Sequence, residues 1–127
     1  MILDTSFLID LIRGKEPAAK KSFELDKLNQ VIFITSVSLF ELWQHADLKN
    51  KDKIESLERL LDLFGILYLD AESAKNGGKI YSELVEKGAT IDPEDCMIAG
   101  IAIHHSMPVL TRDQHFSRIK GIKVETY

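Results

Sequence analysis

The sequence is poor in cysteine and has no long apolar run. Its 127 residues include one cysteine, Cys96, which excludes an intrachain disulfide and a cysteine-rich zinc site. No apolar segment reaches the roughly 20 residues that cross a bilayer, and no basic segment followed by an apolar one marks a signal peptide after Met1. We therefore expect a cytoplasmic protein with no membrane partner.

The sequence also lacks an excess of positive charge. Its 16 Lys and Arg residues stand against 20 Asp and Glu residues, which gives a formal net charge of -4. Proteins that only bind nucleic acid are usually basic, because Lys and Arg neutralise phosphates. An enzyme that meets phosphate through a divalent cation does not need this excess, since the cation supplies the positive charge. The charge argues against simple nucleic-acid binding and leaves phosphate chemistry open.

The length and the ordinary composition predict a single domain that covers residues 1–127. Short apolar segments alternate with segments of helical periodicity. The expected strands cover 1–3, 31–34, 66–69, 109–111 and 123–125, and the expected helices cover about 7–12, 17–29, 37–48, 54–64, 80–88 and 92–105. Apolar strands separated by helices indicate an α/β protein, a three-layer α/β/α sandwich with a central, mostly parallel sheet.

Four carboxylates lie where such a sheet would bring them to one end. Asp4 follows the first expected strand, and Asp113 follows the fourth. Glu41 lies in the first turns of the helix after the second strand, and Asp95 lies in the first turn of the helix before the fourth. Because function collects at the carboxyl ends of parallel strands, we expect the four side chains to converge there.

Some of these acids also have purely structural explanations. Asp4 and Asp113 could cap the helix or turn that follows them. Glu41 could close a capping box with Ser38. Asp95 is harder to explain in this way, because the helix that follows it is apolar on every side and contains no Lys or Arg. A carboxylate at the start of a buried helix is costly unless it is paired or binds a cation.

The expected cluster predicts metal chemistry. Neighbouring carboxylates repel one another, and a divalent cation relieves that repulsion. Mg²⁺ and Mn²⁺ prefer oxygen ligands and retain waters. A metal of this kind lowers the pKa of water and offsets charge on a phosphate. The residues therefore indicate metal-assisted hydrolysis of a phosphate ester, without choosing between a nucleic acid and a small molecule.

Four segments of the sequence resemble the PIN-domain ribonucleases, and most closely the VapC toxins of bacterial and archaeal toxin–antitoxin pairs. The segments cover 2–6, 36–42, 95–102 and 110–116. The resemblance extends over essentially the whole chain. It implies a PIN-like fold, Mg²⁺ or Mn²⁺ as the cofactor and cleavage of RNA phosphodiester bonds. It also implies a set of catalytic and metal-binding acids, which here are Asp4, Glu41, Asp95 and Asp113.

The same resemblance assigns supporting roles. Hydroxyl positions that support the site match Thr5, Ser6 and Thr111, and Asp92 is either a fifth acid or a helix cap. The position of Asp113 varies between Asp and Asn in the family, which implies a weaker role. The sequence departs from the family at Gly100, where Ala is frequent; this change lowers helix propensity and allows closer packing. We expect His115 to orient its loop rather than to take part in chemistry.

The resemblance also implies partners: an RNA substrate, a cognate antitoxin and a second copy of the chain in a homodimer. The candidate contacts to RNA phosphates are Arg13, Lys15 and Arg112. The antitoxin could lie on apolar residues that are alternatively all core, namely Phe7, Leu8, Leu11, Ile12, Leu39, Leu42 and Trp43. An arginine of its tail could also enter the acidic cluster in place of the metal.

Three other functions were weighed against this one. A phospho-acceptor receiver domain needs paired acids after the first strand, but Thr5 and Ser6 follow Asp4, and no Lys occupies the expected later position. A phosphatase of the haloacid type needs a second Asp at the position of Ser6. The third alternative is a PIN-like binding module without activity, which the complete acid set argues against.

Overall fold

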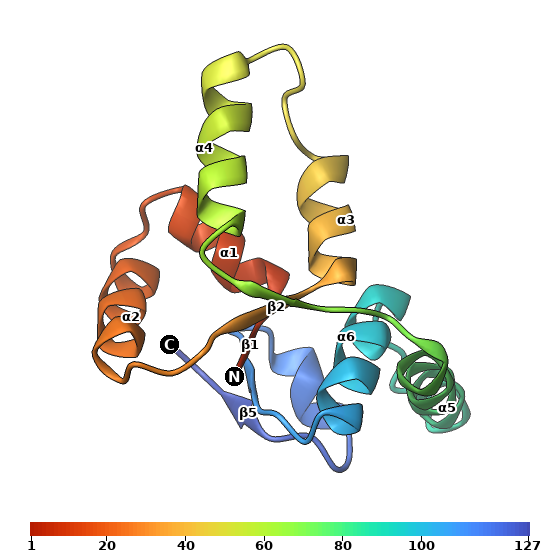
Figure 1. The fold of residues 1–127 in the computed structure, drawn as a ribbon. Helices are drawn as coiled ribbons and strands as arrows, with labels where there is room; N and C mark the ends of the chain where they lie inside the picture. Colours follow the sequence, from red (N-terminus) through yellow and green to blue (C-terminus); the bar gives the residue numbers. More distant parts are fainter.

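A single parallel sheet forms the centre of the protein. The computed structural model describes all residues from 1 to 127, and its five strands follow the order β3-β2-β1-β4-β5. The strands are β1 (Ile2–Leu3), β2 (Phe33–Thr35), β3 (Gly65–Leu67), β4 (Val109–Leu110) and β5 (Val124–Glu125). Every neighbouring pair is parallel, and Ile2 lies opposite both Phe33 and Val109. The predicted α/β class is confirmed, and the sheet is wholly parallel (Figure 1).

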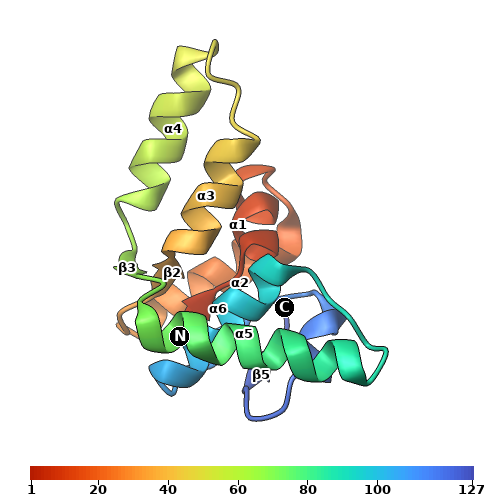
Figure 2. The same cartoon turned by 90° about the vertical axis from the view of Figure 1, so that its right-hand side faces the viewer.

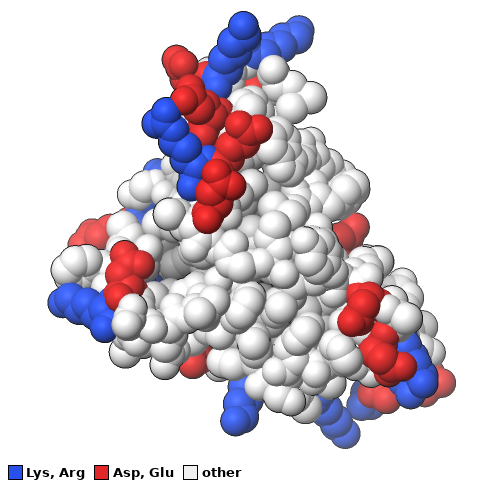
Figure 3. Space-filling view, in the orientation of Figure 1, with Lys and Arg blue, Asp and Glu red and all other residues white.

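Helices cover both faces of the sheet. They are α1 (Thr5–Ile12), α2 (Glu16–Lys27), α3 (Ser36–Gln44), α4 (Lys51–Leu61), α5 (Ala71–Glu86), α6 (Pro93–His104) and the 3₁₀ helix η1 (Gln114–Arg118). Figure 1 and Figure 2 show α5 and α6 on one side and α1 and α2 on the other. The pair α3 and α4 projects away from the sheet, and Figure 3 shows acidic and basic side chains interleaved along α4. No helix combines the length and the apolar character needed to span a membrane.

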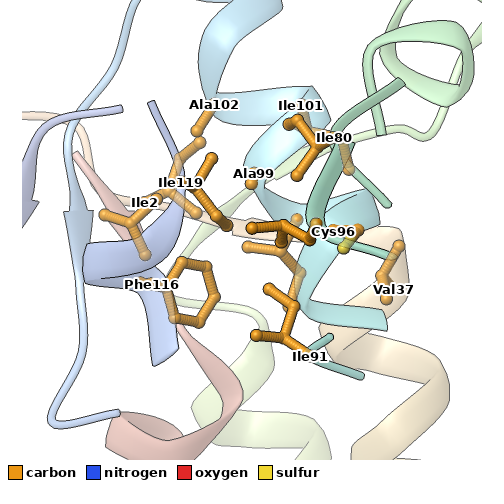
Figure 4. Close-up of a cluster of buried hydrophobic side chains, with 13 residues drawn as sticks. Ile2, Val37, Ile80, Ile91, Cys96, Ala99, Ile101, Ala102, Phe116 and Ile119 are labelled. Atoms are coloured by element: carbon orange, nitrogen blue, oxygen red, sulfur yellow. The ribbon is translucent and has the colours of Figure 1, made fainter. Parts of the chain in front are cut away.

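Residues of the central strands alternate between two apolar cores. Ile2 and Val109 belong to a cluster of 13 buried residues that α5, α6 and η1 complete (Figure 4). Leu3 and Leu110 belong to a cluster of nine buried residues on the side of α1 and α2. Since successive side chains of a strand face opposite sides of a sheet, even a strand of two residues contributes to both cores. The predicted three layers are therefore confirmed.

The helix expected at 80–88 is much longer than its sequence pattern indicated. It is α5, which begins at Ala71. Gly77 and Gly78 in its middle lower the helix propensity, so the sequence pattern did not predict the half of the helix before them. Gly77 lies against Gly100 of α6, where an added Cβ would meet the Gly77 nitrogen at 2.6 Å. Gly100 therefore does permit the closer packing that its departure from the family suggested.

Candidate active site

Asp4 occupies the junction between β1 and α1 and is almost completely buried. It is 3% exposed and is the N-cap residue of α1. Its Oδ2 accepts hydrogen bonds from the hydroxyls of Ser6 (2.6 Å) and Thr111 (2.7 Å) and a longer one from the Ser6 backbone N–H (3.4 Å). Oδ1 accepts none of these bonds. The hydroxyls thus fix the carboxylate by one oxygen and leave the other available to a ligand.

Glu41 reaches the same region from α3. The Thr5 hydroxyl donates to its Oε1 at 3.2 Å. The capping-box alternative for this residue is wrong, because α3 begins earlier than expected: its N-cap is Thr35, whose hydroxyl accepts from the Ser38 backbone N–H at 2.9 Å. Glu41 is therefore not needed to cap α3, and its side chain faces α1 instead.

The pKa of Glu41 is raised from 4.5 to about 7, chiefly by burial. The negative charges of Asp4, Glu94 and Asp92 contribute to this rise, and the hydrogen bond from Thr5 opposes it. Burial also raises the pKa of Asp95, at the start of α6, to about 7. The charges that add to this second shift are those of Asp4, Asp113, Glu41 and Asp92. The four predicted acids are thus close enough to perturb one another, and two of them titrate near neutral pH.

Asp113 lies after β4 and caps η1. Its Oδ1 accepts from the His115 backbone N–H at 2.8 Å, and its own N–H donates to the Thr111 hydroxyl at 2.9 Å. The His115 Nδ1 is 3.1 Å from the same Oδ1. Ligand atoms of Asp95, Asp113 and His115 lie within 4.8 Å of one another. The backbone of His115 contacts Asp113, as its expected loop-orienting role requires. Its ring also lies beside Asp95 and Asp113, which the sequence did not predict.

The donor set fits a hard divalent cation. Asp95 and Asp113, with His115, place ligand atoms within 4.8 Å of one another, and the charges of Asp4 and Glu41 act on Asp95 from nearby. No lysine or arginine forms an ion pair with any of the four acids. Oxygen ligands of this kind suit Mg²⁺ or Mn²⁺, and the imidazole of His115 adds a donor that Mn²⁺ tolerates well. A cation would also relieve the repulsion that raises the two carboxyl pKa values.

Asp92 is the N-cap residue of α6 and also adds negative charge near the cluster. It holds the N-cap position of α6, but its side chain accepts no capping hydrogen bond. Its carboxylate is exposed and raises the pKa of both Glu41 and Asp95. Glu94, which the sequence did not single out, acts on Glu41 in the same way. The predicted N-cap position of Asp92 is therefore confirmed, without a capping hydrogen bond from its side chain, and its role as a fifth acid stays a prediction.

Two of the three predicted phosphate contacts meet at an acid that sequence reasoning missed. Asp10 of α1 is 3% exposed and lies 2.9 Å from Lys15 Nζ and 2.9 Å from Arg112 Nε. Arg13 is exposed at the end of α1 and forms no ion pair. The missed signal was a lone acid inside the apolar stretch of residues 7–12, where a buried carboxylate requires partners.

Comparisons with known proteins show the family to which this chain belongs. A family model described as the PIN domain matches residues 1–122. The chain is 31% identical to a Salmonella typhimurium protein named tRNA(fMet)-specific endonuclease VapC, over 99% of this chain and 96% of that one. It is 29% identical to Ribonuclease VapC1 of Methanocaldococcus jannaschii, over 100% of this chain and 86% of the relative.

Solved structures show the same similarity. A chain of VapBC2 from Rickettsia felis, bound to a DNA fragment from their promoter, superposes with a TM-score of 0.85 at 26% identity, over 98% of this chain and 96% of that chain. A chain of DNA-bound VapBC from Salmonella typhimurium gives a TM-score of 0.85 at 30% identity with the same coverage. These findings set aside the receiver and phosphatase alternatives.

Proposed function

Because the chain belongs to the PIN domain family, and within it to the VapC ribonucleases, we propose that it is a Mg²⁺- or Mn²⁺-dependent endoribonuclease that hydrolyses RNA phosphodiester bonds at its acidic cluster. One observation carries this proposal: acids from four separate segments share a region without basic partners, and burial and mutual repulsion raise the pKa of Glu41 and of Asp95 to about 7. The negative charges of these carboxylates repel one another, and a bound cation would relieve that repulsion.

The chain's own residues supply the metal ligands and hold them in position. Asp4, Asp95, Asp113 and Glu41 would hold the cation, and the hydroxyls of Ser6 and Thr111 orient Asp4 through its Oδ2. When bound, the metal supplies Lewis acidity toward water and toward the phosphoryl oxygens. In the metal-free protein the pKa of Glu41 is about 7, and Thr5 donates to its Oε1, so Oε2 is the oxygen left to bind the cation.

The test of this proposal is cleavage of a panel of transfer, ribosomal and messenger RNAs with added Mn²⁺. Asp4→Asn and Asp95→Asn keep the size of the side chain but remove a ligand charge, so each is expected to abolish most cleavage while the circular-dichroism melt stays similar or rises slightly. Asp26→Asn, at an exposed acid of α2, is the matched control. Wild-type rates in Asp4→Asn would refute the mechanism.

We also propose a cognate antitoxin as the partner that restrains this nuclease. The apolar residues expected at its surface divide into three groups, of which one, Leu11 and Leu39, is partly buried against the core. Phe7, Leu8 and Leu42 are core, at 1%, 0% and 6% exposed. Ile12 of α1 and Trp43 of α3 remain 51% and 36% exposed. An amphipathic segment of the antitoxin would cover this exposed group, because exposed apolar side chains on neighbouring helices are typical of helix-binding surfaces.

Co-purification with the product of the adjacent gene tests the partner. A stable complex with suppressed RNA cleavage is expected, and a change of a tail arginine to Ala in the partner should restore cleavage. Trp43→Ser should weaken the complex, whereas Phe23→Ser, at a 62% exposed aromatic of α2, should not. The homodimer remains a prediction, and sedimentation of the purified chain would test it.

A further inference from the structure

Asp10 is a buried charge that the acidic cluster does not use. Its carboxylate is on α1, the same helix that Asp4 caps, and only 3% of the residue is exposed. Two cations and one hydroxyl meet it: Lys15 at 2.9 Å, Arg112 at 2.9 Å, and the Tyr127 hydroxyl, which donates to Oδ2 at 3.0 Å. The Tyr127 ring packs edge-on against Phe7 at 4.7 Å. A buried carboxylate with this many partners is a built feature rather than a surface ion pair.

The two cations keep donors free for a ligand. Arg112 binds Asp10 through Nε, so the two terminal nitrogens of its guanidinium are not engaged, and its side chain is 50% exposed. Lys15 contributes one ammonium to Asp10, and its side chain is 43% exposed. Two positive charges against one negative charge leave an excess of positive charge at this point. The planar guanidinium with free terminal N–H groups is suited to phosphate oxygens.

This cation pair borders the acidic cluster. Arg112 lies between Thr111, whose hydroxyl donates to Asp4, and Asp113. Along α1, Asp10 follows Ser6 by four residues, so the two share one face of the helix about 6 Å apart along its axis. Ser6 is the residue that holds Asp4 at 2.6 Å. The helix therefore places Asp4 at its N-terminus and Asp10, which the two cations contact, on its later turns.

We propose that Asp10 is a positioning residue that holds Arg112 and Lys15 as a binding subsite for an RNA backbone phosphate next to the one that is cleaved. This inference rests on the proposed ribonuclease function and deepens it. Asp10 fixes rotamers that free lysine and arginine side chains would sample, so the entropy of ordering them is lost on folding rather than on binding. The subsite reads the backbone and not the bases, because its free donors suit phosphate.

Substitutions distinguish positioning from simple charge. Arg112→Gln is expected to raise KM about tenfold, the effect of one lost charge-assisted hydrogen bond, with kcat changed less than about twofold. Asp10→Asn should also raise KM, although it makes the subsite of Arg112 and Lys15 more positive. If Asp10 only neutralised the two cations, Asp10→Asn would lower KM, and that result would overturn the proposal. In the double variant the two effects should not add, since both remove the same held guanidinium.

Binding without cleavage gives a second readout. Fluorescence anisotropy of a labelled single-stranded RNA, measured on Asp95→Asn with Mn²⁺ at several salt concentrations, should show a salt slope that falls by about 0.7 when Arg112→Gln is added. Arg59→Gln, at an exposed arginine of α4 paired with Glu55, is the control and should leave the slope unchanged. Lys15→Gln should lower the salt slope as Arg112→Gln does. This variant still tests the subsite if Asp10→Asn does not fold.

The outcomes separate this inference from the proposed function. Cleavage by the wild type with no effect of Arg112→Gln on KM or on the salt slope would refute the subsite alone. A slope that falls with Arg112→Gln in a protein that cleaves none of the RNA panel would support the subsite and refute the proposed catalysis. Equal slopes for Arg112→Gln and Arg59→Gln would overturn the subsite whatever the activity.

Discussion

Replacing Glu41 with Gln should stabilise the metal-free protein at alkaline pH. The pKa of Glu41 is raised from 4.5 to about 7 in the folded protein. A group whose folded pKa is raised contributes stability that is fully present below its unfolded pKa and is lost as the pH rises through its folded pKa. The wild type therefore loses stability between about pH 4.5 and 7, while Gln, which stays neutral and can still accept from Thr5, does not.

The pKa difference sets the size of the effect. At about 1.4 kcal/mol per pKa unit, a pKa of about 7 in place of 4.5 corresponds to at most about 3 kcal/mol. Glu41 is only partly buried, so solvent screening reduces the gain expected for Glu41→Gln to about 1–2 kcal/mol at pH 8. At about pH 4 both proteins carry a neutral side chain there, and the difference should vanish.

Urea unfolding followed by circular dichroism, in EDTA at the two pH values, measures this difference. Glu83→Gln, at an exposed acid of α5, is the control and should show no such gain. Added Mn²⁺ should reverse the order at pH 8, because a metal at about 100 times its Kd stabilises the wild type by about 2.7 kcal/mol and binds more weakly without Glu41. A Glu41→Gln variant that is less stable than the wild type in EDTA at pH 8 would refute the reasoning.

Three smaller predictions concern Asp113 and the glycines of α5 and α6. In the RNA cleavage assay, Asp113→Asn should retain more activity than Asp4→Asn, because the amide oxygen can still accept from the His115 N–H; equal losses would give Asp113 a full ligand role. In thermal unfolding, Gly100→Ala should destabilise by about 1–3 kcal/mol through overpacking, since the new methyl would lie 2.6 Å from the Gly77 nitrogen. Gly78→Ala meets open space and should stabilise by roughly 0.5–1 kcal/mol, and a loss there would contradict this account.

The layers and the acid positions could be predicted because both follow from local pattern. Apolar strands alternate with helices, and a parallel sheet places every residue that follows a strand at the same end. Asp4 and Asp113 come directly after β1 and β4, which are paired in the sheet. Their convergence needs no knowledge of side-chain contacts. The recognised sequence segments then distinguished a nuclease from other enzymes that use acids at strand ends.

Helix ends were less predictable, because tertiary contacts decide them. The helix expected to reach residue 48 ends at Gln44, where the chain turns toward α4. The first half of α5 was hidden by Gly77, which is unfavourable in an isolated helix but allows α6 to approach closely. At Gly77 a contact distant in sequence overrides the local preference.

The partners of Asp10 were also invisible in the sequence. Lys15 is close along the chain, but Arg112 and Tyr127 are brought to it only by the pairing of β1 with β4 and β4 with β5. The proximity of His115 to Asp95 has the same origin, since one lies after β4 and the other begins α6. Sequence reasoning identifies acids with a reason to be buried, and the fold determines which side chains surround them.

The rigidity of the frame explains why the acids keep their repulsion. Asp95 begins α6, and the close approach of Gly100 to Gly77 fixes α6 against α5. Asp4 is held from the opposite side by Thr111, which is itself fully buried. Because neither carboxylate can move away without disturbing a core, the protein cannot relieve the repulsion by relaxing. Burial, and after it the neighbouring negative charges, raise the pKa of Asp95, and the repulsion among those charges remains available as a driving force for binding a cation.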